Sequence, residues 1–89
     1  MPEMPEPRKL LGICLFETGE IDEGAKQLNL YVTNTQEDAE GHYYLGVALR
    51  LKGRSEEARS QFAEAFRLQP NNLQYEAAAH PERTPPIEH

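Results

Sequence analysis

Three histidines and two pairs of acids are the side chains of this sequence that could carry out chemistry. His42, His80 and His89 lie far apart, and Leu45 and Gly46 occupy the positions three and four residues after His42. A zinc site on a helix would need a second ligand at that spacing. We therefore predict no metal site, and we expect His42 to be a groove or surface residue.

The paired acids are Glu37-Asp38 and Glu56-Glu57, and each pair lies where a helix is expected to start. Acids favour that position because they offset the positive end of the helix dipole. The sequence contains no nucleophile elbow, phosphate-binding loop or zinc-protease motif. We predict that the protein is not an enzyme, with no catalytic residues and no cofactor.

The single cysteine, Cys14, excludes an internal disulfide. Its helix neighbours are apolar and no cationic cluster surrounds it, so we expect a small buried side chain and not a reactive thiol. A lone cysteine is typical of a reducing compartment, which predicts a cytoplasmic protein.

Length and charge restrict the class of protein further. The 89 residues allow one small domain, and 15 acidic against 9 basic residues give a net charge of −6. The acids are scattered, and the clustered basic stripe of a nucleic-acid groove is missing. No run of about 18 apolar residues could span a membrane. We expect no nucleic-acid partner and no membrane-spanning segment.

Helical periodicity organises the chain. Apolar residues recur at helical spacing on both sides of Gly53, which predicts two amphipathic helices joined by a tight turn. The same pattern occurs 34 residues earlier, and this period predicts a helical solenoid. The corresponding residues are Leu45 and Leu11, Gly46 and Gly12, Leu49 and Leu15, Gly53 and Gly19, and Phe62 and Leu28.

The expected helices cover about residues 7–18, 21–33, 39–52, 55–68 and 73–80. We predict N-caps at Thr35 (in a capping box with Asp38), Ser55 and Asn72. Gly53 should end the third helix with a positive φ. Leu11 and Leu15 should point to the partner helix. Gly24, unfavourable in a helix by about 0.5–1 kcal/mol, indicates a close crossing with Gly12.

The residues Leu45-Gly46, Leu49, Gly53, Ala58, Phe62, Ala65 and Pro70 resemble the tetratricopeptide repeat. The resemblance implies an all-α fold of antiparallel helix–turn–helix repeats stacked in a right-handed superhelix of about five helices. It divides the chain into a disordered leader (1–6), a degenerate repeat (5–38), a second repeat (39–72), a capping helix (73–80) and a disordered tail (81–89). In the first repeat, Tyr31 stands where the family has Ala, so it should splay the repeats or turn its hydroxyl outward, and Gln36 stands where the family has Pro.

The resemblance also implies a scaffold that binds a partner peptide or helix on its concave surface. The fifth position of each repeat faces that surface, and side chains one and two turns later continue the stripe. This predicts a partner-binding groove of Lys9, Ile13, Phe16, Tyr43, Val47 and Arg50. Tyr43 and Tyr44 should point to different sides of their helix. The carboxylate clamp of the chaperone-binding subclass is not expected, because Ile13 and Tyr44 replace its asparagines.

Two other interpretations remain open. Because two repeats are fewer than the three or so that usually stabilise a solenoid, the chain could be an assembly unit that self-associates, or a piece of a longer array. It could also be a regulatory subunit of an enzyme. Exposed apolar contacts are expected at Leu10, Phe16 and Tyr44, with a homodimer as the result. The groove residues could equally be exposed side chains without a ligand.

Overall fold

The computed structural model describes residues 7–80, and helices dominate this part of the chain. They are α1 (Pro7–Glu17), α2 (Ile21–Asn34), α3 (Ala39–Leu51), α4 (Ser55–Leu68) and α5 (Leu73–Ala79). Residues 7–80 contain no strand, so the predicted all-α fold is confirmed. The predicted leader (1–6) and the predicted tail (81–89) lie outside the described residues.

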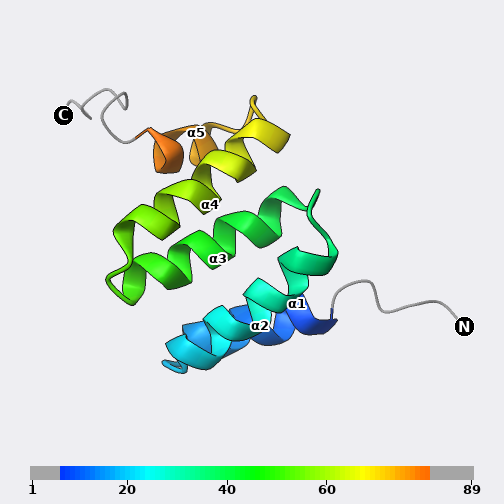
Figure 1. The fold of residues 1–89 in the computed structure, drawn as a ribbon, viewed down its shortest axis with the longest axis vertical. Helices are drawn as coiled ribbons and strands as arrows, with labels where there is room; N and C mark the ends of the chain where they lie inside the picture. Colours follow the sequence, from blue (N-terminus) through cyan, green and yellow to red (C-terminus); the bar gives the residue numbers. More distant parts are fainter. Residues whose placement is uncertain (1–6, 81–89) are drawn as a thin grey trace, which may run out of the picture.

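The helices form a stack of neighbours along the chain. α1 packs against α2, α3 packs against α4, and α2 packs against α3 across the stack, while α5 lies against α4 (Figure 1). The α1–α2 pair and α5 therefore lie at opposite ends, with α3 and α4 between them.

The turn after α3 has the predicted glycine geometry. Gly53 has a φ of 86°, and Gly19, its counterpart after α1, has a φ of 99°. The Gly53 N–H donates to the Arg50 carbonyl at 2.9 Å, and the Arg54 N–H donates to the Leu49 carbonyl at 2.9 Å. This pair of bonds is a Schellman motif, which satisfies the last carbonyls of the helix.

Two of the three predicted N-caps are wrong. Asp38, and not Thr35, caps α3: its carboxylate accepts the N–H groups of Glu40 at 3.0 Å and Gly41 at 3.3 Å. Thr35 is instead the C-cap of α2, whose last residue is Asn34. Ser55 is already the first residue of α4, and the N-cap residue is Arg54, which makes no side-chain cap bond. The third prediction, Asn72, is confirmed: its side-chain oxygen accepts the Tyr75 N–H at 3.1 Å.

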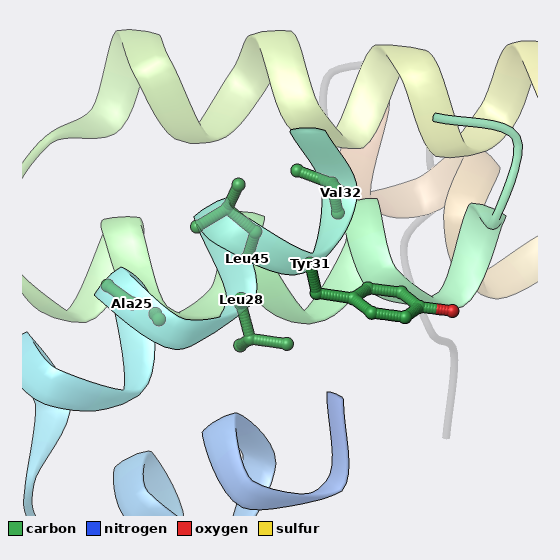
Figure 2. Packing of buried hydrophobic residues seen from close by; sticks show 6 residues of the cluster. Ala25, Leu28, Tyr31, Val32 and Leu45 are labelled. Carbon is green, nitrogen blue, oxygen red and sulfur yellow. The ribbon is translucent and has the colours of Figure 1, made fainter. Parts of the chain in front are cut away.

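The largest hydrophobic cluster lies between α2 and α3 and joins the two helix pairs (Figure 2). It consists of Ala25, Leu28, Tyr31, Val32, Leu45 and Ala48, and we call it the α2–α3 core. Ile13 and Phe16 of α1 pack against it from one side. Two further clusters hold α5 against α3 and α4.

The predicted burial of Cys14 and Leu11 is wrong. Cys14 is exposed, and 48% of Leu11 is exposed, whereas its counterpart Leu45 is 2% exposed. The difference follows from position in the stack. α2 covers Leu45 and Ala48 on α3, but within residues 7–80 no helix packs against the equivalent side of α1.

Candidate functional site

Four aromatic rings form a continuous row across α1, α3 and α5. Phe16 lies 6.0 Å from Tyr44, Tyr44 lies 5.3 Å from Tyr43, and Tyr43 lies 5.0 Å from Tyr75, measured between ring centroids. We call these four residues the aromatic row. It links helices that are far apart in sequence, and it includes two of the six predicted groove residues.

Tyr43 and Tyr44 pack against different neighbours. Tyr44 leans on the α2–α3 core beside Phe16, whereas Tyr43 contacts Phe62 and Tyr75. The two rings nevertheless contact each other edge to face, because both side chains start from one turn of α3. Both rings are half-buried. Their buried parts hold the helices together.

The phenols of Tyr44 and Tyr75 are neutral hydrogen-bonding groups at neutral pH. Burial, reinforced by the nearby Glu40 carboxylate, raises the pKa of both Tyr44 and Tyr75. The Tyr43 hydroxyl accepts a hydrogen bond from the Gln74 amide at 3.0 Å, which ties α5 to α3.

The other predicted apolar groove residues, Ile13 and Val47, are half-buried. Ile13 packs against the α2–α3 core, and Val47 packs against the cluster that holds α5. These side chains therefore serve the interior as well as the surface. The neighbour of Phe16 is Tyr44 and not Tyr43.

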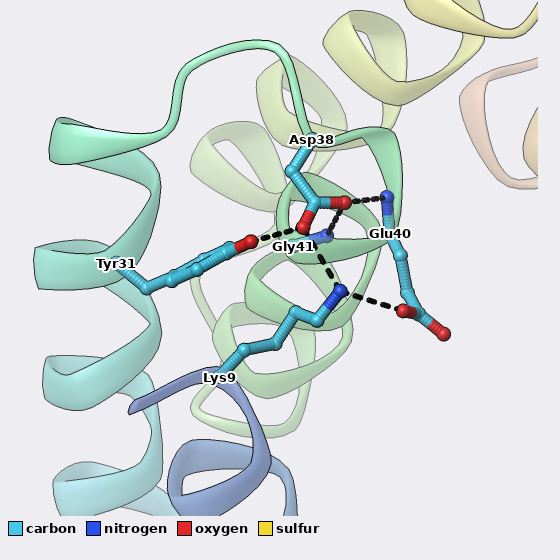
Figure 3. A network of polar contacts seen from close by, with 5 residues as sticks. All are labelled: Lys9, Tyr31, Asp38, Glu40 and Gly41. Atoms are coloured by element: carbon cyan, nitrogen blue, oxygen red, sulfur yellow. Dashed lines mark hydrogen bonds and ion pairs between the residues drawn. The ribbon is translucent and has the colours of Figure 1, made fainter. Parts of the chain in front are cut away.

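Lys9 is not the free groove cation that the sequence predicts. It is buried, and its Nζ lies 2.9 Å from Asp38 Oδ2 and 2.8 Å from Glu40 Oε1 (Figure 3). Burial by itself lowers the pKa of Lys9, but the hydrogen bonds to Glu40 and Asp38 outweigh it and raise the pKa above its usual value. The ammonium is therefore charged and already paired.

Tyr31 completes this network, and its hydroxyl is not turned outward, which was one of its two predicted arrangements. The ring is buried and its hydroxyl donates to the Asp38 carboxylate. Room for the ring comes from Gly41, where a Cβ atom would lie 2.8 Å from Tyr31 Cε2. Burial of Asp38 raises its pKa, but the bonds from Tyr31 and Lys9 outweigh that effect and lower it.

Arg50 remains available to a partner. It is exposed at the last turn of α3, and its guanidinium carbon lies 5.6 Å from the Phe62 ring centroid. Stacking on an aromatic ring restrains an Arg side chain while its N–H donors stay accessible.

His42 is buried and so is not a surface residue, one of its two expected places, but it does line a hollow with Gln36 and Gln61. Its Nε2 lies 2.9 Å from the Gln36 carbonyl oxygen, and its Nδ1 lies 2.7 Å from the Gln61 side-chain oxygen. Both partners are carbonyl oxygens, which only accept, so each ring nitrogen of His42 faces an acceptor. Residues 7–80 contain no group of three side chains that could hold a metal ion.

A hollow of about 410 Å3 between α2 and α4 was not predicted. Its floor includes Ala25 and Leu45, and its rim carries charges of both signs. Four of the rim residues form ion pairs: Lys52 with Asp22 at 3.2 Å, and Arg54 with Glu57 at 3.5 Å. The sequence gives no signal for the hollow, because it depends on the distance between two helices that are not consecutive. The rim charges are Asp22, Lys26, Lys52, Arg54 and Glu57.

Comparisons with known proteins give a match for the part of the chain that contains Tyr43 and Tyr44. The profile of the tetratricopeptide repeat matches residues 39–72, the segment that forms α3 and α4. No curated protein matches the chain. Of the helices in residues 7–80, none combines the length and apolarity needed to cross a membrane. Repeats of this family are in general protein–protein interaction modules. The chain therefore contains a tetratricopeptide repeat, formed by residues 39–72.

Proposed function

We propose that this protein is a non-enzymatic scaffold that binds a peptide or helix of a partner protein along the aromatic row. The observation that carries the proposal is the run of four touching rings across α1, α3 and α5. Aromatic and Arg side chains are the usual anchors of interface energy, and Arg50 lies exposed on the same helix as Tyr43. A cytoplasmic location without nucleic-acid partners is part of this proposal.

The ligand should be an apolar segment with one acid. Phe16, Tyr43 and Tyr44 offer half-buried aromatic surface to apolar side chains, and Arg50 offers a fork that matches a carboxylate. A second acid near α1 would gain little, because Lys9 is already neutralised by Asp38 and Glu40.

We also propose that residues 5–38 form a second, degenerate repeat, stacked on the first in a right-handed superhelix. Its support is one contact that recurs with the period of the sequence. A Cβ atom on Gly12 would lie 2.7 Å from Leu28 Cγ, and one on Gly46, 34 positions later, would lie 2.6 Å from the Phe62 ring. The same glycine-to-helix approach therefore sets both helix pairs.

A displayed library of random peptides, selected on the intact protein, tests the binding proposal. Apolar peptides with one acid should be enriched, and the Arg50→Glu variant should bind them at least about tenfold more weakly, because the substitution places like charges together. Lys26→Glu, on the rim of the hollow between α2 and α4, is the matched charge reversal and should leave binding unchanged.

Two results would contradict the proposal. One is a set of selected peptides whose affinity drops with Lys26→Glu but not with Arg50→Glu, which would place binding in the hollow. The other is a selection on this protein that enriches no peptide sequence beyond those enriched by selection on an unrelated helical protein of similar charge.

A further inference from the structure

One side of α1 carries apolar side chains that are open to solvent. Leu10 is 56% exposed and Leu11 is 48% exposed, and Cys14 is exposed as well. Residues three and four apart on a helix lie on one side, so these three form a single surface. We call it the α1 face. It is distinct from the aromatic row, to which α1 contributes Phe16.

The period of the chain shows what kind of surface this is. Leu11 and Cys14 correspond, 34 residues later, to Leu45 and Ala48. Both of these counterparts are buried in the α2–α3 core, where α2 lies over them. The α1 face therefore has the side-chain pattern of a surface that receives a helix, and exposed apolar patches of this kind mark interfaces.

The opposite end of the stack is already closed. Ala65 of α4 is packed against Tyr75 of α5, and Ala79 of α5 packs against Ala58 and Phe62. A head-to-tail contact between copies would have to displace α5 from these positions. If two copies meet, the open end of one therefore meets the open end of the other, which gives a closed, two-fold arrangement.

The charges of α1 favour the antiparallel form of that arrangement. Each of α2, α3, α4 and α5 has an acid in its first turn, but α1 has none. α1 instead carries Glu17 at its carboxyl end, where an acid is unfavourable for the helix dipole. In an antiparallel pair, Glu17 of each copy comes beside the positive start of α1 in the other copy.

We propose that two copies of this chain form a homodimer in which the α1 helices pack antiparallel through Leu10, Leu11 and Cys14. The dimer leaves the aromatic row of each copy outside the contact between α1 faces. The dimer proposal can therefore be tested independently of the peptide-binding proposal.

Sedimentation equilibrium over a wide concentration range tests the dimer, with paired variants. Leu11→Glu places a charge in the α1 face, and the dissociation constant should rise at least about 100-fold, as for a central interface residue. Leu51→Glu is the matched control, because Leu51 is 54% exposed and lies on α3 outside the face. Circular dichroism melts should show that both variants fold.

Glu17→Lys tests the antiparallel orientation. The change reduces the net charge of −6 by two units, and weaker repulsion between copies would by itself favour association. The proposed pairing predicts the reverse, a several-fold weaker dimer. A short bis-maleimide should also link two chains through Cys14, because the two Cα atoms come within about 10 Å in such a pair.

The proposal is overturned if the wild-type protein stays monomeric at the highest concentration, which would leave the α1 face to a helix of another protein. It is also overturned if Leu11→Glu dimerises as well as Leu51→Glu. A dimer that Glu17→Lys strengthens, and that the bis-maleimide does not link, would show a different geometry and would equally overturn it.

Discussion

The ammonium group of Lys9 lies 2.9 Å from the carboxylate of Asp38, although 29 residues separate them in the sequence. Asp38 is also the N-cap of α3 and accepts the Tyr31 hydroxyl. One carboxylate therefore joins α1, α2 and α3. In a chain of this size such a junction is a large part of the stability, because the hydrophobic core of a small domain is marginal.

Asp38→Asn should destabilise the protein by about 1–3 kcal/mol at neutral pH, the range for hydrogen bonds to a charged group. Asn is itself a good N-cap, so the loss reports the carboxylate charge. Urea unfolding at pH 7 measures it. Asp22→Asn is the control, because Asp22 pairs with Lys52 at the surface and such pairs contribute only about 0–1 kcal/mol.

The same variant predicts a pH dependence. Folding lowers the pKa of Asp38, so its contribution is present above the unfolded pKa of about 3.9 and is lost as the pH falls through the folded value. Folding raises the pKa of Lys9, so the cation stays charged throughout that range. The stability gap between wild type and Asp38→Asn should be constant from about pH 5 to 8 and narrow below about pH 4. A constant gap down to pH 3 would contradict the assignment.

Gly53→Val should destabilise the fold by about 1–2 kcal/mol, because the φ of 86° is a left-handed conformation that a β-branched residue adopts only with strain. Gly53→Asn should recover much of the loss, since Asn tolerates that region. Thermal melts followed by circular dichroism measure both. Equal melting midpoints for Val and Asn would show that the turn adopts another geometry in solution.

Gly24→Ala tests the crossing of α1 and α2. Alanine improves helix propensity by about 1 kcal/mol, but its Cβ atom would lie 2.8 Å from the Gly12 carbonyl oxygen and 2.8 Å from the Phe16 amide nitrogen. Backbone atoms cannot move aside, so the helices must separate, and we expect a net loss of about 1–3 kcal/mol in urea unfolding. Asn29→Ala, exposed on the same helix, should be slightly stabilising, whereas stabilisation by Gly24→Ala would show a looser crossing.

The helices and their glycines follow from local signals, which is why the sequence predicts them. Gly53 and Gly24 each have a conformational or steric requirement that no other residue meets as well, so their positions are informative on their own. The confirmed crossing of Gly12 with Gly24 rests on this logic.

The candidate site was harder to predict, because it depends on what neighbouring helices cover. Lys9 occupies the same repeat position as Tyr43, yet Asp38 and Glu40 bind its ammonium group and remove it from the surface. Cys14 occupies the position of Ala48, yet it is exposed because α1 stands at the end of the stack. Periodicity gives the position of a side chain in its repeat, but not whether a neighbouring helix is present.

Tyr43→Ala should weaken the binding of selected peptides and also destabilise the fold. The sequence alone predicts that this substitution mainly weakens the binding free energy, by about 1–3 kcal/mol. The ring, however, lies 5.7 Å from Phe62 and 5.0 Å from Tyr75, so its removal also opens a gap between α3 and α5, at a cost of about 2 kcal/mol or more. Arg50→Ala removes an exposed side chain and should affect binding alone.

Calorimetric titration with a selected peptide, together with urea unfolding, separates the two effects. If Tyr43→Ala unfolds like the wild type, its ring does not hold α5 in solution; if it binds like the wild type, the aromatic row is not the binding surface.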